Sequence, residues 1–469
     1  MQPPQQPKAY EPPDPERPAS AALTEPELER EMPGGHDTGG HDPYAALRVP
    51  GYRLYALGTI LLFMGQQAQS VAIGWELAVR DPKHAAMALS FVGLVGAAPV
   101  ILLALPAGQL ADRIDRKRLV IAMAILAAMC SVGLSIFSYQ HWPTSYMYGL
   151  LLLGATAWAL GGPARSALAP QIVPINVFSN AMMWAATFFQ VSAISGPALA
   201  GWIIGWEYVH LRGRTLPTLP LAYLIDAFSG VAFAILLLFV RVRPIETRKE
   251  PASLKTLLAG IHFVGRNQII LATITLDLFA VLLGGATYLL PIYATSILHV
   301  GAQGFGWLRA APALGAATMA MAIAHLPPMK RAGRDLLLAV IGFGVATIVF
   351  GLSKSFWLSL AMLYLTGAFD NISVVVRHTL VQVLTPDEMR GRVSAVNNVF
   401  IGASNELGGW ESGLTAQIFG PVISVVGGGI GTILVVIATA LTWPRLRQFG
   451  SLHDAKPIEE AEVPVATSS

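Results

Sequence analysis

The sequence predicts an all-α membrane protein whose twelve transmembrane helices form two pseudo-symmetric six-helix bundles. Of the 469 residues, 54% are hydrophobic and only 13% are charged, whereas a soluble domain has about 25% charged residues. The mean hydropathy is +0.55. Apolar runs near 20 residues, the length that a helix needs to cross about 30 Å of hydrocarbon, recur along the chain. The second half of these runs repeats features of the first half.

Continuous apolar runs favour helices, because backbone groups in lipid need partners within the same segment. A β-barrel would instead show strands of about ten alternating residues, and the run 336–349 does not alternate. We expect spans at 54–79, 87–110, 119–139, 145–169, 178–206, 219–241, 267–297, 303–325, 335–353, 356–383, 393–419 and 421–443.

Lysine and arginine concentrate in the loops that follow the even-numbered spans, such as 113–118 and 241–266. Because cytoplasmic loops carry the excess of basic residues, we expect both termini in the cytoplasm of a multi-pass protein of the cell inner membrane. The expected parts are a disordered cytoplasmic tail (1–48), an N-terminal bundle (49–241), a cytoplasmic linker (242–266), a C-terminal bundle (267–445) and a second cytoplasmic tail (446–469).

An internal repeat relates the two halves at a shift of 212 or 213 residues. The matched positions are Gly93 with Gly306, Pro99 with Pro312, Arg165 with Arg377, Pro174 with Pro386, Gly196 with Gly408, and Gly201 with Gly413. A duplicated six-helix unit is the architecture of transporters whose halves alternate around a midplane site.

Several function classes are excluded by missing motifs. The chain has no Gly-x-x-x-x-Gly-Lys-Ser/Thr phosphate loop, no His-Glu-x-x-His zinc site and no Gly-x-Ser-x-Gly nucleophile turn, so we expect no enzyme activity, no cofactor and no metal centre. The His-Asp pairs in the segment 34–42 fit a flexible glycine tail better than a metal site. A net charge of +3, with the basic residues in short loops, makes nucleic acid an unsuitable partner.

The loop after the second span, 108–118, resembles the signature loop of the major facilitator superfamily, Gly-x-x-x-Asp-Arg-x-Gly-Arg-Arg. A small residue permits close helix contact, an aspartate can face a helix N-terminus, and arginines can bridge to acidic groups. The sequence departs from the family pattern at Asp115, where glycine is usual, which puts the tight turn in doubt. The resemblance implies a gating latch, with simple charge anchoring as the alternative. We assign to it Gly108, Asp112, Arg113, Arg116, Arg165, Arg377 and Arg392, and expect Arg165 and Arg377 to pair with acidic loop groups.

The segments 162–174 and 385–413 narrow this resemblance to the branch with enterobactin (siderophore) exporters and secretion-type permeases. The resemblance covers roughly residues 50–445. The element 195–201 partly matches the Gly-Pro-x-x-Gly-Gly element of proton-driven exporters, with Ala200 in place of a glycine; a packing kink is the alternative interpretation. The arginine element usual in the middle of the fourth span of proton antiporters is missing.

Ionisable residues deep in the spans are candidates for function, because each costs about 2.5–3.5 kcal/mol on insertion scales. Burial favours the neutral form of a carboxyl group, so acids there could take up and release a proton. The proton-coupling candidates are Asp277, Asp370, Glu406 and Arg309; a fixed partner inside the bundle is the alternative for each acid. Candidates for contact with a bulky substrate are Gln66, Gln67, Gln69, Trp158, Trp184, Phe188 and Gln190. Asp226 and Glu76 are expected nearer the outer face.

Together these observations favour a secondary transporter that exports a small amphiphilic molecule by alternating access against protons. The resemblance suggests a siderophore or a drug-like compound. A lipid or lysolipid transporter of the same fold is the alternative, and a sensor that transports nothing is a third. The partners expected are the small-molecule substrate, protons and membrane lipids, with a monomer as the default.

Overall fold

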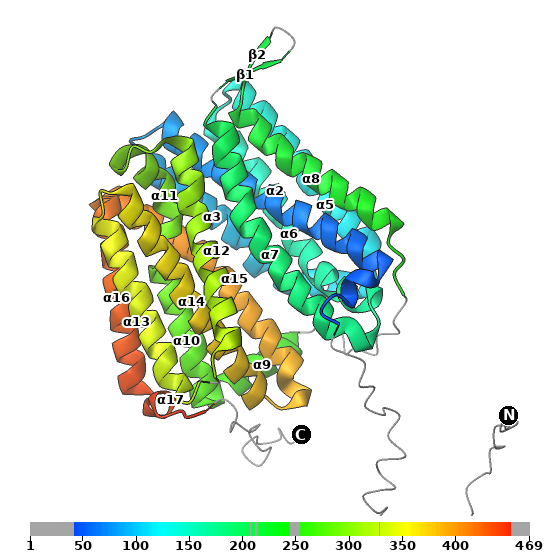
Figure 1. The fold of residues 1–469 in the computed structure, drawn as a ribbon, viewed down its shortest axis with the longest axis vertical. Coiled ribbons are helices and arrows are strands. Elements are labelled where there is room, and N and C mark those ends of the chain that lie inside the picture. Colours follow the sequence, from blue (N-terminus) through cyan, green and yellow to red (C-terminus); the bar gives the residue numbers. More distant parts are fainter. Residues whose placement is uncertain (1–41, 207, 212–213, 244–253, 328, 452–469) are drawn as a thin grey trace, which may run out of the picture. The chain divides into compact units, whose positions relative to one another are not determined.

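The computed structural model describes residues 42–206, 208–211, 214–243, 254–327 and 329–451. The described residues from Tyr44 onward form a single compact unit, whose helices are labelled in Figure 1. Of the predicted disordered tail 1–48, residues 1–41 lie outside the described residues, whereas Ala46–Arg48 form a 3-10 turn in which Ala46 is fully buried. Residues 452–469 of the second predicted tail, 446–469, also lie outside the described residues.

Where the structure describes it, the first half consists of a 3-10 turn, seven helices and one β-hairpin, in which β1 pairs antiparallel with β2. In chain order the elements are η1 (Ala46–Arg48), α2 (Pro50–Arg80), α3 (Ala85–Leu102), α4 (Ala104–Arg113), α5 (Arg116–Gln140), α6 (Thr144–Ile172), α7 (Ile175–Ile204), β1 (Tyr208–Leu211), β2 (Arg214–Pro217) and α8 (Leu219–Phe239).

The second half begins with a helix in the expected linker and continues through the second bundle. Its elements are α9 (Leu254–Arg266), α10 (Gln268–Leu283), η2 (Ala286–Leu289), α11 (Leu290–Ile292), η3 (Tyr293–Ile297), α12 (Gly301–His325), α13 (Ala332–Leu352), α14 (Phe356–Leu384), α15 (Asp387–Phe419), α16 (Pro421–Thr442) and α17 (Pro444–Arg447). We call the side with the β-hairpin the hairpin end and the side with α9 the linker end.

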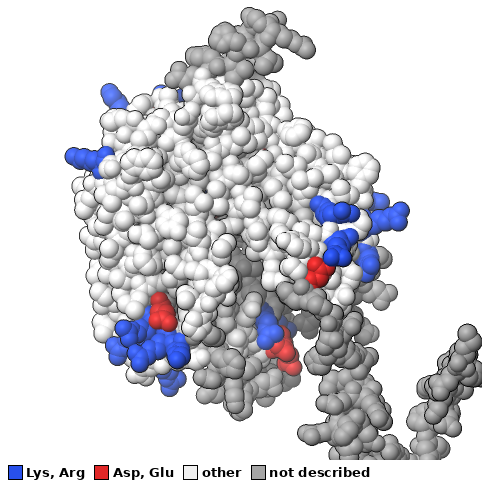
Figure 2. Space-filling model, in the orientation of Figure 1, with Lys and Arg blue, Asp and Glu red and all other residues white. Residues whose placement is uncertain are grey.

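The prediction of an all-α membrane protein is confirmed. In the described residues, 11 helical segments are long and apolar enough to cross a membrane. The eleventh predicted span, 393–419, corresponds to α15, which has 33 residues but is not apolar enough by the same measure. In Figure 2 the charged side chains gather at the lower left, the lower middle and the right edge, with a few at the upper left, and most of the visible middle is uncharged.

Two predicted spans are interrupted. The second divides at Leu103 into α3 and α4, three residues before Pro106. Proline lacks a backbone N–H, so Pro106 cannot donate a helical hydrogen bond to the Leu102 carbonyl. The seventh ends as a regular helix at Leu283 and continues after Gly284 through short 3-10, α and π turns. Glycine weakens a helix interior, so both breaks fall where the sequence contains helix-weakening residues.

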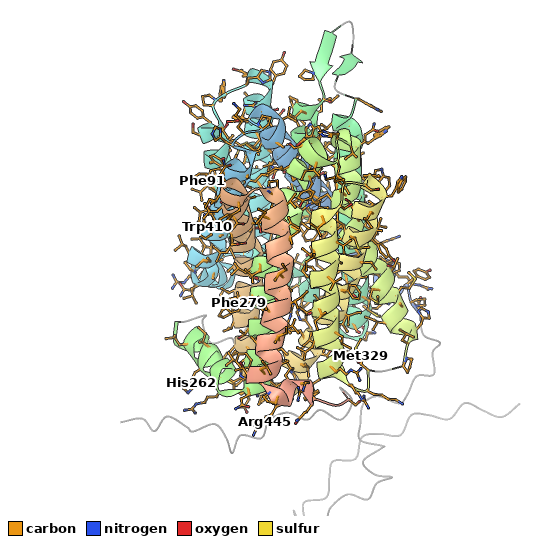
Figure 3. The ribbon with its side chains drawn as sticks, turned by 90° about the vertical axis from the view of Figure 1, so that its left-hand side faces the viewer. Phe91, His262, Phe279, Met329, Trp410 and Arg445 are labelled. Atoms are coloured by element: carbon orange, nitrogen blue, oxygen red, sulfur yellow. The ribbon has the colours of Figure 1, made fainter. Side chains whose placement is uncertain are left out.

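Two seams join the halves toward the hairpin end: α3 packs on α15 and α7 packs on α12. A Cβ added at Gly201 on α7 would lie 2.6 Å from the Ala302 carbonyl oxygen on α12. A Cβ added at Gly93 on α3 would lie 2.6 Å from the backbone nitrogen of Trp410 on α15. Glycine therefore allows the backbones to approach closely at both seams. Figure 3 shows Phe91 and Trp410 at the α3–α15 seam.

The two seams are equivalent under the internal repeat. Gly93 on α3 matches Gly306 on α12, and Gly201 on α7 matches Gly413 on α15. Gly306 packs against Gly201, and a Cβ at Gly413 would lie 2.7 Å from the α3 carbonyl oxygen of Ala86. The equivalent pair of helices thus forms both contacts, and the predicted pseudo-symmetry of the two bundles is confirmed.

Local capping explains where several helices begin. The Asp115 carboxylate accepts a hydrogen bond of 2.8 Å from the Arg118 backbone N–H and caps α5. Its φ is −53°, so the turn does not need the family glycine. Asn267 caps α10 in the same way, and Gly420, with φ +90°, permits the sharp turn between α15 and α16.

Candidate substrate cavity and buried charges

A cavity of about 210 Å³ lies among the helices of the first half. Its walls come from α2, α3, α5, α6 and α8, with one residue, Glu406, from α15 of the second half. Much of the wall formed by α5 and α6 consists of small residues: Ala124, Ala127, Ala128, Gly154, Ala155 and Gly161. Because these side chains are short, α5 and α6 leave a narrow space between them along this part of the cavity.

A polar cluster at Asp226 lines this cavity. The Ser131 hydroxyl donates a hydrogen bond of 2.6 Å to Asp226 Oδ2, and the Gln69 side-chain amide donates one of 3.2 Å to the same oxygen. Gln69 also donates to Ser131 Oγ at 2.7 Å. Since Asp226 is 8% exposed, these donors replace the water that it loses.

Glu406 brings a carboxylate from the second half to the cavity of the first half. Its side chain lies over Gly96 of α3, where any Cβ would collide with it. The Tyr288 hydroxyl and the Arg309 guanidinium, both from the second half, interact with this carboxylate. Arg309 Nη1 also donates to the Thr287 carbonyl oxygen at 3.4 Å. Two of the predicted proton-coupling residues, Glu406 and Arg309, therefore belong to one cluster.

Arg165 lies in the cavity wall, in contact with aromatic rings. Its guanidinium carbon is 3.9 Å from the centre of the Trp158 ring and 5.9 Å from that of Phe63, distances suited to cation–π attraction. The Phe63 and Trp158 rings meet edge to face at 5.7 Å. The acidic loop partner expected for Arg165 is not found among the described residues.

Asp277 on α10 forms an ion pair with Arg377 on α14 inside the second bundle. Their side chains are 9% and 4% exposed, so Arg377 contacts a buried acid rather than the expected loop group. A second small cavity, about 20 Å³, is lined by both Asp277 and Asp370, which is room for about one water molecule. The pairing matches the fixed-partner alternative for Asp277.

The predicted substrate residues divide into two groups. Gln66, Gln69 and Trp158 line the cavity of about 210 Å³, whereas the remaining four take part in helix packing. Trp184 and Phe188 stack on each other along α7 at 5.3 Å. The Gln190 amide donates to the Ala313 carbonyl oxygen of α12 at 3.2 Å, and Gln67 packs against Gly196.

The predicted latch residues lie at the linker end. Arg116 Nη2 is 3.8 Å from Asp112 Oδ1, and the Lys117 ammonium donates to the Leu238 and Val240 carbonyl oxygens at the end of α8. Gly108 and Arg113 lie on α4, while Arg392 lies on α15, where its backbone approaches Gly260 of α9. The contacts named here for the loop connect α4, α5 and α8, all within the first half.

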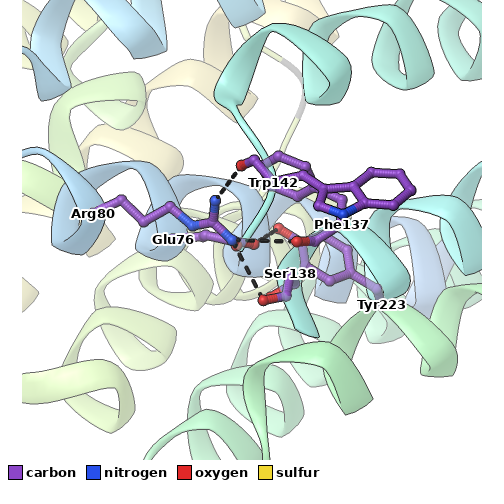
Figure 4. Close-up of polar contacts among 6 residues, drawn as sticks. All are labelled: Glu76, Arg80, Phe137, Ser138, Trp142 and Tyr223. Carbon is purple, nitrogen blue, oxygen red and sulfur yellow. Dashed lines mark hydrogen bonds and ion pairs between the residues drawn. The ribbon is translucent and has the colours of Figure 1, made fainter. Parts of the chain in front are cut away.

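A further ion pair closes the hairpin end of the first bundle (Figure 4). Arg80 Nη2 lies 2.6 Å from Glu76 Oε1, and the Tyr223 hydroxyl donates to Glu76 Oε2 at 2.6 Å. Arg80 also donates to the carbonyl oxygens of Phe137 and Trp142. These bonds tie α2, α5 and α8 together, which gives Glu76 a structural explanation.

Sequence reasoning missed three participants in the cavity. Asp226 was expected nearer the outer face but was not named as a substrate-contacting residue, and it forms part of the cavity wall. Tyr288, beside Glu406, and Phe63, beside Arg165, were not singled out. The only signal for Asp226 was a lone acid in an otherwise apolar span, and the rotation of that helix could not be read from the sequence.

A family model described as "Transmembrane secretion effector" matches residues 41–467. The chain belongs to this family. The result confirms the predicted resemblance to the secretion-type branch of the major facilitator superfamily.

Two of the curated relatives are enterobactin exporters. Enterobactin exporter EntS of Citrobacter koseri is 26% identical over 407 residues, which cover 85% of this chain and 93% of the relative. Its counterpart in Escherichia coli O1:K1 is 25% identical with the same coverage.

Solved structures show the same fold. A bacterial homologue of the human lysosomal transporter Spinster, inward-facing and unoccupied, has a TM-score of 0.63 at 14% identity, covering 87% of this chain and 99% of that chain. An inward-facing bacterial homologue of the iron transporter ferroportin has a TM-score of 0.60 at 16% identity, covering 84% and 99%. The chain is a multi-pass membrane transporter of the major facilitator type and, like these relatives, not an enzyme.

Proposed function

We propose that this transporter exports a small amphiphilic molecule, of a siderophore or drug-like class, across the cytoplasmic membrane by alternating access and in exchange for protons. The observation that carries the proposal is the position of Glu406. A carboxylate from the second half lines a cavity built by the first half, so movement of one half against the other must change its surroundings. The direction of transport is taken from the enterobactin exporters to which the chain is similar.

The seams support alternating access as part of this proposal. Toward the hairpin end the halves approach closely through Gly93 and Gly201, so solute passing there requires the seams to separate. The cavity of about 210 Å³ is also smaller than the 300–1,000 Å³ typical of ligand pockets. A solute as large as a siderophore would therefore require the two bundles to move apart.

We further infer that the linker end faces the cytoplasm, because the loops there carry most of the lysine and arginine. Residues 49–241 and 267–445 would then be the two moving bodies, connected by 242–266. The transporter is proposed to act as a monomer among membrane lipids.

The experiment measures proton-coupled efflux in proteoliposomes with an imposed pH gradient. Glu406→Gln should abolish coupling while the protein still inserts, because the amide cannot bind and release a proton at that position. The matched control is Glu411→Gln, which removes an acid five residues later on the same helix and outside the cavity lining. Unchanged coupling in Glu406→Gln would remove this residue from the mechanism.

A lipid or lysolipid transporter of the same fold is the second candidate. The cavity is narrow where small residues of α5 and α6 line it, and this shape favours a slender solute over a bulky one. Competition of candidate siderophores and lysolipids for the same efflux signal separates the two proposals.

A further inference from the structure

Arg165 is a charged group in the cavity wall without a counter-ion among the described residues. Its guanidinium lies against Trp158 and Phe63; within 4.0 Å, no described carboxylate pairs with it. Aromatic faces offset only part of the cost of removing a cation from water. A ligand that carries a negative charge would provide the missing partner.

The internal repeat offers a comparison within the same molecule. Arg377, the counterpart of Arg165 at a shift of 212, has the buried partner Asp277. The first-half position that matches Asp277 is Gly65, and Trp158 occupies the position that matches Asp370. One copy of the arginine is thus neutralised by the protein, and the other lines a cavity.

The shape of the cavity restricts the apolar part of a ligand whose charged group binds Arg165. Its lining on α6 extends from Leu150 to Arg165, about 22 Å at 1.5 Å per residue. A volume of about 210 Å³ spread over such a length leaves a slender space. The small residues Ala127, Gly154 and Gly161 on α5 and α6 suit an unbranched chain better than a ring system.

The charged residues of the cavity also determine the orientation in which the ligand binds. Arg165 lies about 32 Å along α6 from the hairpin end, whereas Asp226 lies about 10 Å along α8 from the same end, both at 1.5 Å per residue. An anionic head group is attracted to Arg165 and repelled by Asp226 and Glu406, so the apolar chain would point toward the hairpin end.

We propose that the cavity binds a single-chain anionic amphiphile, with its carboxylate or phosphate on Arg165 and its acyl chain between α5 and α6. This inference rests on the second candidate of the proposed function, a lipid or lysolipid transporter, and names the substrate class of that site. The shared chemistry is an anionic head on one chain, and it occurs both in free fatty acids and in membrane-derived lysophospholipids.

The test measures binding of radiolabelled laurate to the full chain in nanodiscs of zwitterionic phosphatidylcholine, with empty nanodiscs subtracted. Laurate should bind more tightly than dodecylamine, which has the same chain length and the opposite charge. Arg165→Gln should weaken laurate binding by about tenfold or more, the loss expected for a hydrogen bond to a charged group. Arg165→Lys should retain more laurate affinity than Arg165→Gln, and neither variant should weaken dodecylamine binding.

A second pair of variants tests the chain-binding part. A Cβ at Gly154 would lie 3.8 Å from the Cys130 Cβ, an ordinary contact, so Gly154→Leu should fold and fill the cavity. Gly149→Leu is the matched control on the same helix, because Gly149 is exposed and a Cβ there meets nothing within 4 Å. Gly154→Leu should weaken laurate binding at least tenfold, and Gly149→Leu should not. If Arg165→Gln does not fold, this pair and Arg165→Lys decide the outcome.

Equal binding of laurate and dodecylamine, or unchanged laurate binding in folded Arg165→Gln, would overturn the proposal. Lysophosphatidate in place of laurate identifies the source: tighter binding indicates a membrane lipid, and tighter laurate binding indicates a free acid. The binding measurement and a transport measurement test the two proposals independently. Laurate binding that depends on Arg165 without any solute transport would refute the proposed export function alone, whereas transport of some solute without this binding would refute the inference alone.

Discussion

Neutralising Asp277 should destabilise the second bundle strongly. Asp277 and Arg377 form an ion pair at 9% and 4% exposure, and Arg377 Nε has no hydrogen-bond acceptor among the described residues. The guanidinium therefore depends on Asp277. Asp277→Asn leaves a buried cation without its counter-ion, and breaking such a pair from one side costs about 3–5 kcal/mol.

Removing both charges should be far less harmful than removing one. Arg377→Gln alone leaves the buried carboxylate unpaired, but the double variant Asp277→Asn/Arg377→Gln has two neutral amides that can bond to each other. We expect a coupling energy of at least about 2 kcal/mol between the two positions. The coupling should be stabilising, so the double variant should be more stable than either single variant.

The free energy of unfolding can be measured by titrating SDS into dodecyl maltoside micelles and following helicity by circular dichroism. Asp387→Asn is the control, because Asp387 pairs with Arg390 at 2.7 Å while their side chains are 84% and 47% exposed. An exposed pair contributes about 0–1 kcal/mol, so this variant should differ little from the parent protein.

The reasoning is refuted if Asp277→Asn is no less stable than Asp387→Asn, or if the double variant is as unstable as the sum of the single variants. Efflux measured on the same proteins separates two roles. A double variant that is stable and active limits Asp277 to holding Arg377, whereas one that is stable and inactive shows that the carboxylate itself is needed for transport.

Three further predictions concern other contacts. Gly201→Ala should lower the free energy of unfolding, measured by the same SDS titration, by about 1–3 kcal/mol, because the new Cβ meets the backbone of α12. The control Gly162→Ala should leave the free energy of unfolding unchanged, because nothing lies within 4 Å of a Cβ there. Asp112→Asn should slow efflux without changing substrate preference, and an altered preference in competition assays would contradict the latch interpretation. Tyr223→Phe removes the 2.6 Å hydrogen bond to Glu76 and should cost about 1–3 kcal/mol; no measurable loss would show that water replaces the hydroxyl.

The sequence predicted the spans well, because about 20 apolar residues are needed wherever a helix crosses hydrocarbon. The predicted span 145–169 corresponds to α6, Thr144–Ile172, and 356–383 corresponds to α14, Phe356–Leu384. The breaks at Leu103 and Gly284 were not predicted, since composition alone does not show where a helix yields. The β-hairpin and α9 lie between spans, where hydropathy gives no signal.

The candidate site was predicted less completely, because it depends on which face of each helix points inward. The sequence indicated that Asp277 lies deep in a span, but it assigned Arg377 to the latch. The two residues lie 100 positions apart, and no local pattern pairs them. Arg165 was assigned to the latch from its place near a helix end, whereas the packing of α6 turns it onto Trp158. Periodicity identifies helices and leaves their rotation about the bundle axis undetermined.

The polar character of α15 has a consequence for how the protein is made. This helix is not apolar enough to qualify as a span, and it packs between α3 and α10. The translocon releases a segment into lipid according to its hydrophobicity, so α15 should partition poorly when it emerges from the ribosome. To insert, α15 would need to pack against α3 and α10, which are synthesised earlier. Damage to either partner should therefore appear first as failed co-translational assembly and proteolytic clearance, before any defect in activity could be measured.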